Sequence, residues 1–211
     1  MIAQEGWSRI AAFAMLALGM QIFAGTIWAL PFWLLLLFVV QFFRDPDREI
    51  PQQPGAIVSP AHGRVIAIEN VVDPYIQRRA LKISIFMNIF SVHSNRTPVE
   101  GVVIKKWYTK GQFLNASLDK ASDLNERSAV HFRTNDGWDV TSVQIAGLVA
   151  RRILCYLNHG QKVERGERYG FIRFGSRVDL YLPEDTYVVA QLGRWVLSGS
   201  DIIGFLPISE N

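Results

Sequence analysis

A glycine followed by a serine, Gly175-Ser176, lies between two runs in which apolar residues mostly alternate, Gly170–Phe174 and Val178–Leu182. Such alternation is typical of β-strands. A glycine at this point weakens strand pairing and often marks a close approach of the backbone to another group. Two interpretations are open: a hairpin corner that carries a surface serine, or a peptide bond that is itself the substrate of a reaction with the serine hydroxyl.

The segment around Gly175-Ser176 resembles the processing site of the phosphatidylserine decarboxylases, in their short bacterial form. Further runs resemble that family in the same order along the chain, from about Phe42 to Leu182. These runs are Phe43-Arg-Asp-Pro46, Ser59-Pro-Ala-His-Gly63, Asn88-Ile-Phe-Ser-Val-His-Ser-Asn-Arg96, Phe113-Leu-Asn-Ala-Ser-Leu-Asp-Lys-Ala121, Asn125-Glu-Arg127 and Gln144-Ile-Ala-Gly-Leu-Val-Ala-Arg-Arg152.

The resemblance implies that the protein breaks its own Gly175–Ser176 bond and converts Ser176 into a covalent pyruvoyl group, which is the cofactor of the family. Elimination would release a chain of residues 1–175 and leave the pyruvoyl group at the start of chain 176–211. Its carbonyl would be the electron sink for decarboxylation of phosphatidylserine to phosphatidylethanolamine. The implied partners are the membrane lipid and the two chains of the cleaved protein, and a homodimer stays open.

Two histidines are candidates for the proton transfers. A lone histidine such as His93 in a polar segment is usually solvated, but the resemblance puts the family's catalytic histidine here, as general base toward Ser176. His62 stands where the family has an aspartate that orients and charges this histidine. An imidazole can accept a hydrogen bond but supplies no negative charge, and in serine proteases loss of the triad carboxylate costs roughly 10⁴ in rate. Three outcomes are open: His62 substitutes, another carboxylate such as Asp119 or Asp179 takes over, or the protein stays largely uncleaved.

Arginine suits the phosphate and carboxylate of a serine lipid, because its guanidinium can bind either group through two hydrogen bonds. We therefore expect Arg96, Arg151 and Arg173 to bind the head group, although each could instead be a solvated strand residue. Asn115 is expected to hold the site through its amide, or to shape a turn. The remaining histidines have no partner at metal-ligand spacing, and no metal is predicted.

Residues 1–43 are expected to form a membrane-anchoring helical hairpin. From Ile10 to Phe43 no residue is charged, and Gly25-Thr26 divides this run into two segments. A membrane span needs about 20 apolar residues, so whether the hairpin crosses the bilayer or only dips into it is open. Arginines flank both ends, which puts both ends on the cytoplasmic side of a bacterial inner membrane.

Residues 44–55 form a polar, proline-rich linker, and residues 56–211 are expected to form a β-rich catalytic domain that is cleaved between 175 and 176. We expect layered sheets with hairpins like those of lipoyl and biotinyl domains, and no strong amphipathic helix after Phe43. The predicted strands are Ile57–Val58, Arg64–Val72, Leu81–Phe86, Val99–Tyr108, Ala129–Phe132, Val140–Ile145, Val149–Leu157, Gly170–Phe174, Val178–Leu182, Tyr187–Leu192 and Trp195–Leu197.

The net charge, the distribution of aromatic residues and the number of cysteines limit the partners and the covalent cross-links that we expect. The net charge is only +3, and the aromatic residues sit mostly in apolar runs without a basic face, so nucleic acid is not expected as a partner. The single cysteine, Cys155, excludes an internal disulfide. Two alternatives remain beside a decarboxylase: a membrane-anchored, lipoyl-like adaptor domain without catalysis, and a decarboxylase-like protein inactivated by His62.

Overall fold

A computed structural model describes residues 1–117, 124–147, 153–173 and 175–207 of the protein. The chain divides into two compact units, Met1–Asp47 and Arg48–Asn211. Each unit is described by itself below.

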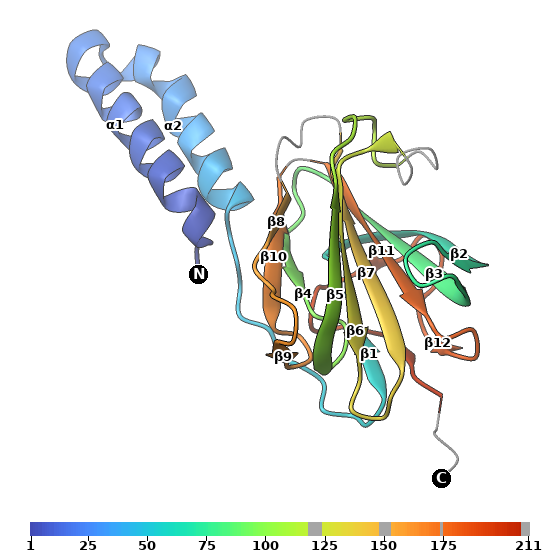
Figure 1. The fold of residues 1–211 in the computed structure, drawn as a ribbon. Helices are drawn as coiled ribbons and strands as arrows, with labels where there is room; N and C mark the ends of the chain where they lie inside the picture. The colour runs from blue at the N-terminus through green and yellow to red at the C-terminus, as the bar shows by residue number, and fades with distance from the viewer. Residues whose placement is uncertain (118–123, 148–152, 174, 208–211) are drawn as a thin grey trace. The chain divides into compact units, whose positions relative to one another are not determined.

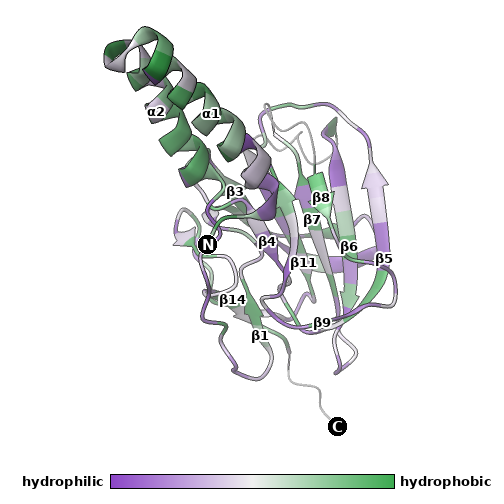
Figure 2. Cartoon of the chain, turned by 90° about the vertical axis from the view of Figure 1, so that its left-hand side faces the viewer, coloured by the Kyte–Doolittle hydropathy of each residue, from purple (hydrophilic) through white to green (hydrophobic). Residues whose placement is uncertain are grey.

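The first unit is a pair of apolar helices, α1 (Trp7–Ala24) and α2 (Thr26–Phe42), preceded by a short 3₁₀ turn, Gln4–Gly6. Both helices are predominantly hydrophobic along their length, as Figure 2 shows. Within the described chain, one helical stretch, Gln4–Ala24, is long and apolar enough to cross a membrane, and Thr26–Phe42 is apolar but shorter. Gly25 joins the two helices with φ at +84°, a conformation that glycine adopts without strain.

The second unit consists of short and medium-length β-strands (Figure 1). Their bounds are β1 Ala56–Val58, β2 Gly63–Asp73, β3 Arg78–Met87, β4 Ser94–Arg96, β5 Gly101–Thr109, β6 Arg127–Arg133, β7 Asp139–Ile145, β8 Ile153–Cys155, β9 Lys162–Val163, β10 Arg168–Ile172, β11 Ser176–Leu182, β12 Tyr187–Val188, β13 Trp195–Val196 and β14 Ile202–Phe205. The prediction of a mainly β domain after an apolar helical segment is confirmed.

Eight strands form one sheet in the order β13-β2-β3-β11-β7-β6-β5-β9, and every pair in it is antiparallel. Two three-stranded sheets, β1-β14-β12 and β4-β10-β8, complete the unit. Strand β11 is internal to the large sheet, with β3 on one side and β7 on the other (Figure 1). Both edges of β11 are therefore hydrogen-bonded, which fixes its register.

The side chains of β11 alternate between two buried faces. Val178, Leu180 and Leu182 belong to the main hydrophobic core. Tyr181 belongs to a smaller cluster on the opposite face, with Ala129 and Val143 among its members. Since successive side chains of a strand point to opposite sides, Ser176 faces the main core, and Arg177 and Asp179 face the smaller cluster.

Most predicted strands are present, with shifted ends. The predicted strand Val178–Leu182 begins two residues earlier, at Ser176, because the Ser176 backbone already pairs with Met87 of β3. Strands β4, β9 and β14 were not predicted. Part of the predicted strand Val149–Leu157 is observed as β8, and its residues 149–152 lie outside the described residues.

Candidate active site

Ser176 is completely buried at the start of β11. Among the described residues, no group makes a hydrogen bond with its Oγ. The buried hydroxyls of Ser84, Thr141, Thr186 and Ser198 share this property, and a catalytic role is one of the recognised reasons for it. The preceding Gly175 has φ at +57°, a left-handed conformation that favours glycine. The chain therefore bends directly before Ser176, whose hydroxyl has no hydrogen-bond partner among the described residues.

The carbonyl group of Gly175 is seated against Gly147, just beyond the end of β7. A Cβ atom placed on Gly147 would lie 1.5 Å from the Gly175 carbonyl oxygen and 2.6 Å from its carbon. No side chain fits there unless the carbonyl moves. The absence of a side chain at Gly147 is thus what lets this carbonyl occupy its position, a role that the sequence interpretation did not foresee.

The loop after β5 closes the same region. Ala116 is buried, and its Cβ would lie 3.3 Å from a Cβ on Gly147. Asn125 holds this loop: its Oδ1 accepts the N–H of Leu114, and its Nδ2 donates to the carbonyls of Leu114 and Ala146. The loop is consequently fastened to the end of β7, beside the Gly175 carbonyl.

His93 is completely buried and lies just before β4. Its carbonyl oxygen accepts the N–H of Ile172 at 3.2 Å, and its ring lies against Phe171 with ring centroids 6.2 Å apart. Both partners are in β10, which leads to the Gly175 bend within three residues. His93 therefore contacts β10, the strand that directly precedes the segment with Gly175 and Ser176.

His62 is half-buried, and its Nδ1 accepts the backbone N–H of Val92 at 3.2 Å. An imidazole nitrogen that accepts a hydrogen bond carries no proton, so in the neutral ring the proton is on Nε2. Val92 directly precedes His93, so the hydrogen bond from Val92 holds the backbone that presents the candidate base. The ring of Trp195 also contacts His62, with centroids 6.0 Å apart.

A buried amide network lies on the core side of the sheet. Gln144 Nε2 donates to Asn95 Oδ1 at 2.9 Å and to the Leu154 carbonyl at 3.3 Å. Gln144 Oε1 accepts no hydrogen bond from the described residues. It faces the same side as Ser176, because its register partner is Val178, and the sequence interpretation missed it. A buried polar residue in an apolar strand is the signal that could have found it.

Arg177 and Asp179 form a buried ion pair on the face opposite to Ser176. Arg177 Nη2 donates to Asp179 Oδ2 at 2.9 Å, and Arg177 Nε lies within ion-pair distance of Asp179 Oδ1, at 2.8 Å. Arg177 Nη1 also donates to the Ala116 carbonyl at 3.4 Å. Burial, with the charge of Asp179 in addition, raises the pKa of Tyr181 on the same face, which keeps that phenol neutral.

Asp119 and Asp179 are the candidate carboxylates that could take the place of the aspartate that the family has at position 62. Asp179 is engaged with Arg177 on the far side of β11, so its carboxylate is separated from the Ser176 hydroxyl by the sheet. Asp119 lies outside the described residues. His62 is the candidate that the structure connects to the His93 segment.

The expected head-group residues fall into different environments. Arg96 Nη1 donates to the Gly166 carbonyl at 3.0 Å. Asn115 accepts from the N–H and hydroxyl of Ser117 in a turn next to the loop residue Ala116. Arg173 lies between β10 and Gly175 in the sequence, and Arg151 lies outside the described residues.

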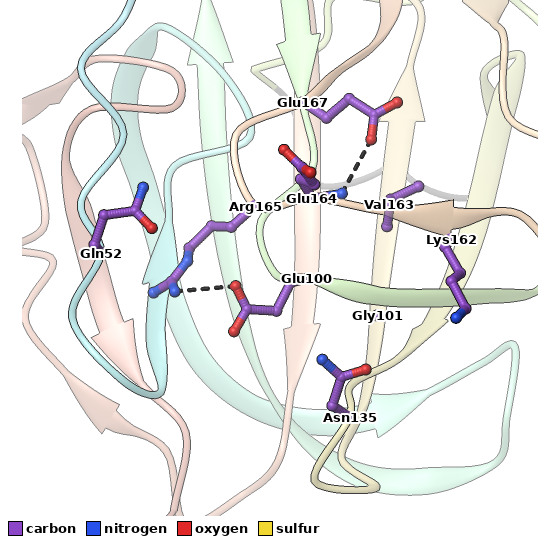
Figure 3. Close-up of a pocket in the computed structure, with 9 residues that line it drawn as sticks. All are labelled: Gln52, Glu100, Gly101, Asn135, Lys162, Val163, Glu164, Arg165 and Glu167. Carbon is purple, nitrogen blue, oxygen red and sulfur yellow. Dashed lines mark hydrogen bonds and ion pairs between the residues drawn. The ribbon is translucent and has the colours of Figure 1, made fainter.

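A cavity of about 890 Å³ lies at the start of β5 and around β9 (Figure 3), and Ser176, His93 and His62 do not line it. None of the nine residues drawn around it belongs to the candidate site. Arg165 pairs with Glu100 there at 3.0 Å and donates to the carbonyls of Gln53 and Ala56. Arg165 therefore holds the segment from Gln53 to Ala56 in place within the second unit.

Known proteins resemble the chain over nearly its whole length. The family model for phosphatidylserine decarboxylase matches residues 35–204. A phosphatidylserine decarboxylase proenzyme of Aromatoleum aromaticum is 58% identical over 207 residues, which is 98% of this chain and 96% of the relative. Proenzymes of the same name are 55% identical in Nitrosomonas europaea, over 96% of this chain and 94% of the relative, and 57% identical in Burkholderia multivorans, over 97% and 96%. The chain belongs to the phosphatidylserine decarboxylase family.

Proposed function

We propose that this protein decarboxylates phosphatidylserine to phosphatidylethanolamine, using a pyruvoyl group that it makes by cleaving its own Gly175–Ser176 bond. The family supports the reaction and the substrate. The observation that carries the site is the buried, unpartnered Ser176 Oγ next to a left-handed Gly175 whose carbonyl occupies the side-chain position of Gly147.

The residues at hand fit the formation of a pyruvoyl group. Ser176 Oγ attacks the Gly175 carbonyl carbon, the C–N bond breaks, and the amide becomes an ester. Removal of the Ser176 α-proton then expels the Gly175 carboxylate and leaves dehydroalanine. Water hydrolyses the enamine form of that residue, which releases ammonia and leaves the pyruvoyl carbonyl. The products are the chains 1–175 and 176–211.

His93 is the group proposed to move the protons in these steps, first from the hydroxyl and later to the product carbon. A base must be held at a defined position to work in this way. The hydrogen bond from Ile172 to the His93 carbonyl and the one from Val92 to His62 support such a position. His62 acts as a positioning residue, because its contact is with the backbone of the segment.

The pyruvoyl carbonyl supplies the electron sink for loss of carbon dioxide. Toward the lipid, we propose that Arg173 and Asn115 act near the reacting centre. Arg173 is two residues before Gly175, and Asn115 directly precedes Ala116, whose Cβ would lie 3.3 Å from a Cβ on Gly147. Arg96 and Arg151 are proposed only as outer contacts of the phosphate. Both chains stay together after cleavage, because β11 pairs with β3 and β7 of the other chain.

We further propose that residues 1–43 anchor the enzyme in the bacterial inner membrane, that residues 44–55 link this anchor to the catalytic domain, and that residues 56–211 lie on the cytoplasmic face. An apolar helix at the N-terminus supports membrane association. The arginines at both ends of the apolar run support the orientation.

Intact-mass measurement of the full-length protein and its Ser176→Ala variant tests the proposal. We expect a fragment of residues 176–211 that reacts with a hydrazide at its N-terminus, together with decarboxylation of phosphatidylserine, and neither in the variant. A single uncleaved chain in both proteins, without decarboxylation, would leave a non-catalytic membrane-anchored adaptor as the better description.

A further inference from the structure

An exposed apolar surface borders the His62 segment. Its first part is the turn between β3 and β4. Its second part is the exposed side of the edge strand β13, with Arg64 of the neighbouring β2 and Leu197 directly after β13. We define the docking face as the exposed residues of these two parts: Ile89, Phe90, Arg64, Trp195 and Leu197.

The turn places its apolar residues outward and its polar residues inward. Asn88 Oδ1 accepts the N–H of Phe90 at 2.9 Å, and Ser91 Oγ accepts the N–H of Asn88 at 3.2 Å. Ser91 is buried, whereas Ile89 is 41% and Phe90 59% exposed. This inverts the usual surface turn, in which polar side chains face the solvent, and adjacent exposed large apolar residues point to an interaction surface.

The edge strand repeats this arrangement. Trp195 is the register partner of Arg64, so both side chains are on the same side of the sheet, while Val65 and Val196 are buried on the other side. Trp195 is 52% exposed, and Leu197, whose N–H is held by Asp201 Oδ2 at 2.8 Å, is 39% exposed.

His62 connects the two parts. Its ring contacts Trp195, and its Nδ1 accepts the N–H of Val92, two residues after Phe90. The docking face therefore borders the segment that carries His93. An exposed tryptophan and leucine beside an exposed arginine have the chemistry of the membrane interface: the indole suits the head-group level, and the arginine attracts anionic lipid.

We propose that the docking face binds directly to the surface of an anionic bilayer, and that it does so in addition to any anchoring by α1 and α2. This inference rests on the proposed function, because it explains how a lipid head group reaches a serine that is fully buried. Contact of this face with the bilayer puts the His62–His93 segment at the head-group level. The substrate then enters the site without leaving the membrane.

Nitroxide quenching in nanodiscs tests the contact. A polarity-sensitive dye is attached to Leu197→Cys in the full-length protein carrying Cys155→Ser, and anionic nanodiscs contain lipids with a nitroxide in the head-group region. The matched control is Val72→Cys, because Val72 is 58% exposed on the same strand as Arg64, eight residues and about 26 Å along it. We expect quenching at position 197 at least about twice that at position 72. Equal quenching at the two positions would overturn the proposal.

Activity on membrane-bound and on monomeric substrate distinguishes an effect on membrane binding from an effect on the chemical steps. For Leu197→Asp we expect kcat/KM on phosphatidylserine in anionic vesicles to fall about tenfold, since the variant loses an apolar side chain that would be buried in the bilayer and gains a charge of the same sign as the anionic lipid. Activity on a short-chain, monomeric phosphatidylserine and self-cleavage should equal those of the wild type. Val72→Asp should change neither activity. An equal loss on both substrates would overturn the proposal, whereas an absence of activity in the wild type would overturn the proposed function and leave the quenching result intact.

Discussion

At the residue scale, two absent groups shape the surroundings of the Gly175–Ser176 bond in the described part of the chain: a side chain at Gly147 and a hydrogen-bond partner for Ser176 Oγ. Gly147 has no side chain, so the Gly175 carbonyl can take the place of one. Ser176 Oγ has no hydrogen-bond partner among the described residues, so no bond must be broken before it attacks. The first feature lets the carbonyl occupy its position, and the second leaves the hydroxyl without a hydrogen bond to these residues that its attack would have to break.

Gly147→Ala should slow self-cleavage by roughly 10²-fold, because a shift of the carbonyl by about 1 Å is enough to lose attack geometry. The measurement is the rate at which fragment 176–211 accumulates, followed by intact mass. Gly204→Ala is the control, since its Cβ would meet the Tyr187 carbonyl oxygen at 2.9 Å in a different sheet. Equal slowing in both variants would contradict a specific role for Gly147.

His62 can be tested by separating its hydrogen bond from its charge. His62→Leu loses the acceptor for the Val92 N–H, and one net hydrogen bond of about 1 kcal/mol predicts cleavage about fivefold slower. His62→Asp can keep an acceptor there and adds the negative charge that favours a protonated His93, so it should cleave at least as fast as wild type.

The His62 pair of variants also decides between the open outcomes. If wild type is uncleaved and His62→Asp cleaves, His62 inactivates the protein. If His62→Leu cleaves as fast as wild type, the contact with Val92 does not position the base. Thermal melting of each variant provides the control for folding.

At the scale of elements, β11 is held from both edges and by an ion pair on its back face. The Arg177–Asp179 ion pair is buried and hydrogen-bonded, and Arg177 also donates to the loop carbonyl of Ala116. This pair directly follows Ser176, so it fixes the start of the strand on the side away from the reacting hydroxyl.

Asp179→Ala should lower the free energy of unfolding by about 3–5 kcal/mol, because it leaves Arg177 buried without its counter-charge. Urea unfolding in a Ser176→Ala background measures this on a single uncleaved chain. Glu184→Ala is the matched control: its partner Arg79 is 79% exposed, and exposed pairs contribute about 0–1 kcal/mol. A loss of less than 1 kcal/mol for Asp179→Ala would contradict the structural role of the pair.

The sequence predicted strands well where apolar residues alternate, as in β3, β7 and β11. It missed β4, because Ser94 and Asn95 are polar and become buried only through partners distant in the sequence, such as Gln144. Ser176 and His93 were identified through family resemblance. Gly147 was not, since the need for a missing side chain depends on where another segment of the chain passes.

At the scale of the whole molecule, the apolar helices and the candidate site belong to separate compact units of the chain. The β unit contains the candidate site and its supporting hydrogen bonds, all within residues 48–211. The helices contain no charged residue from Ile10 to Phe43. If these helices form the proposed membrane anchor, their lengths decide whether they can cross the bilayer.

Helix α2 has 17 residues and helix α1 has 18, which at 1.5 Å per residue gives about 26 and 27 Å. The hydrocarbon core is about 30 Å thick, and a mismatch of a few ångströms is absorbed by small local thinning. We therefore predict that the hairpin crosses the bilayer and that its turn reaches the periplasmic surface. In Cys155→Ser spheroplasts, a membrane-impermeant maleimide should label Thr26→Cys at the turn but not Val72→Cys in the β unit. Labelling of Val72→Cys alone would reverse the orientation, and labelling of neither residue before lysis would mean that the hairpin only dips into the membrane from the cytoplasmic side.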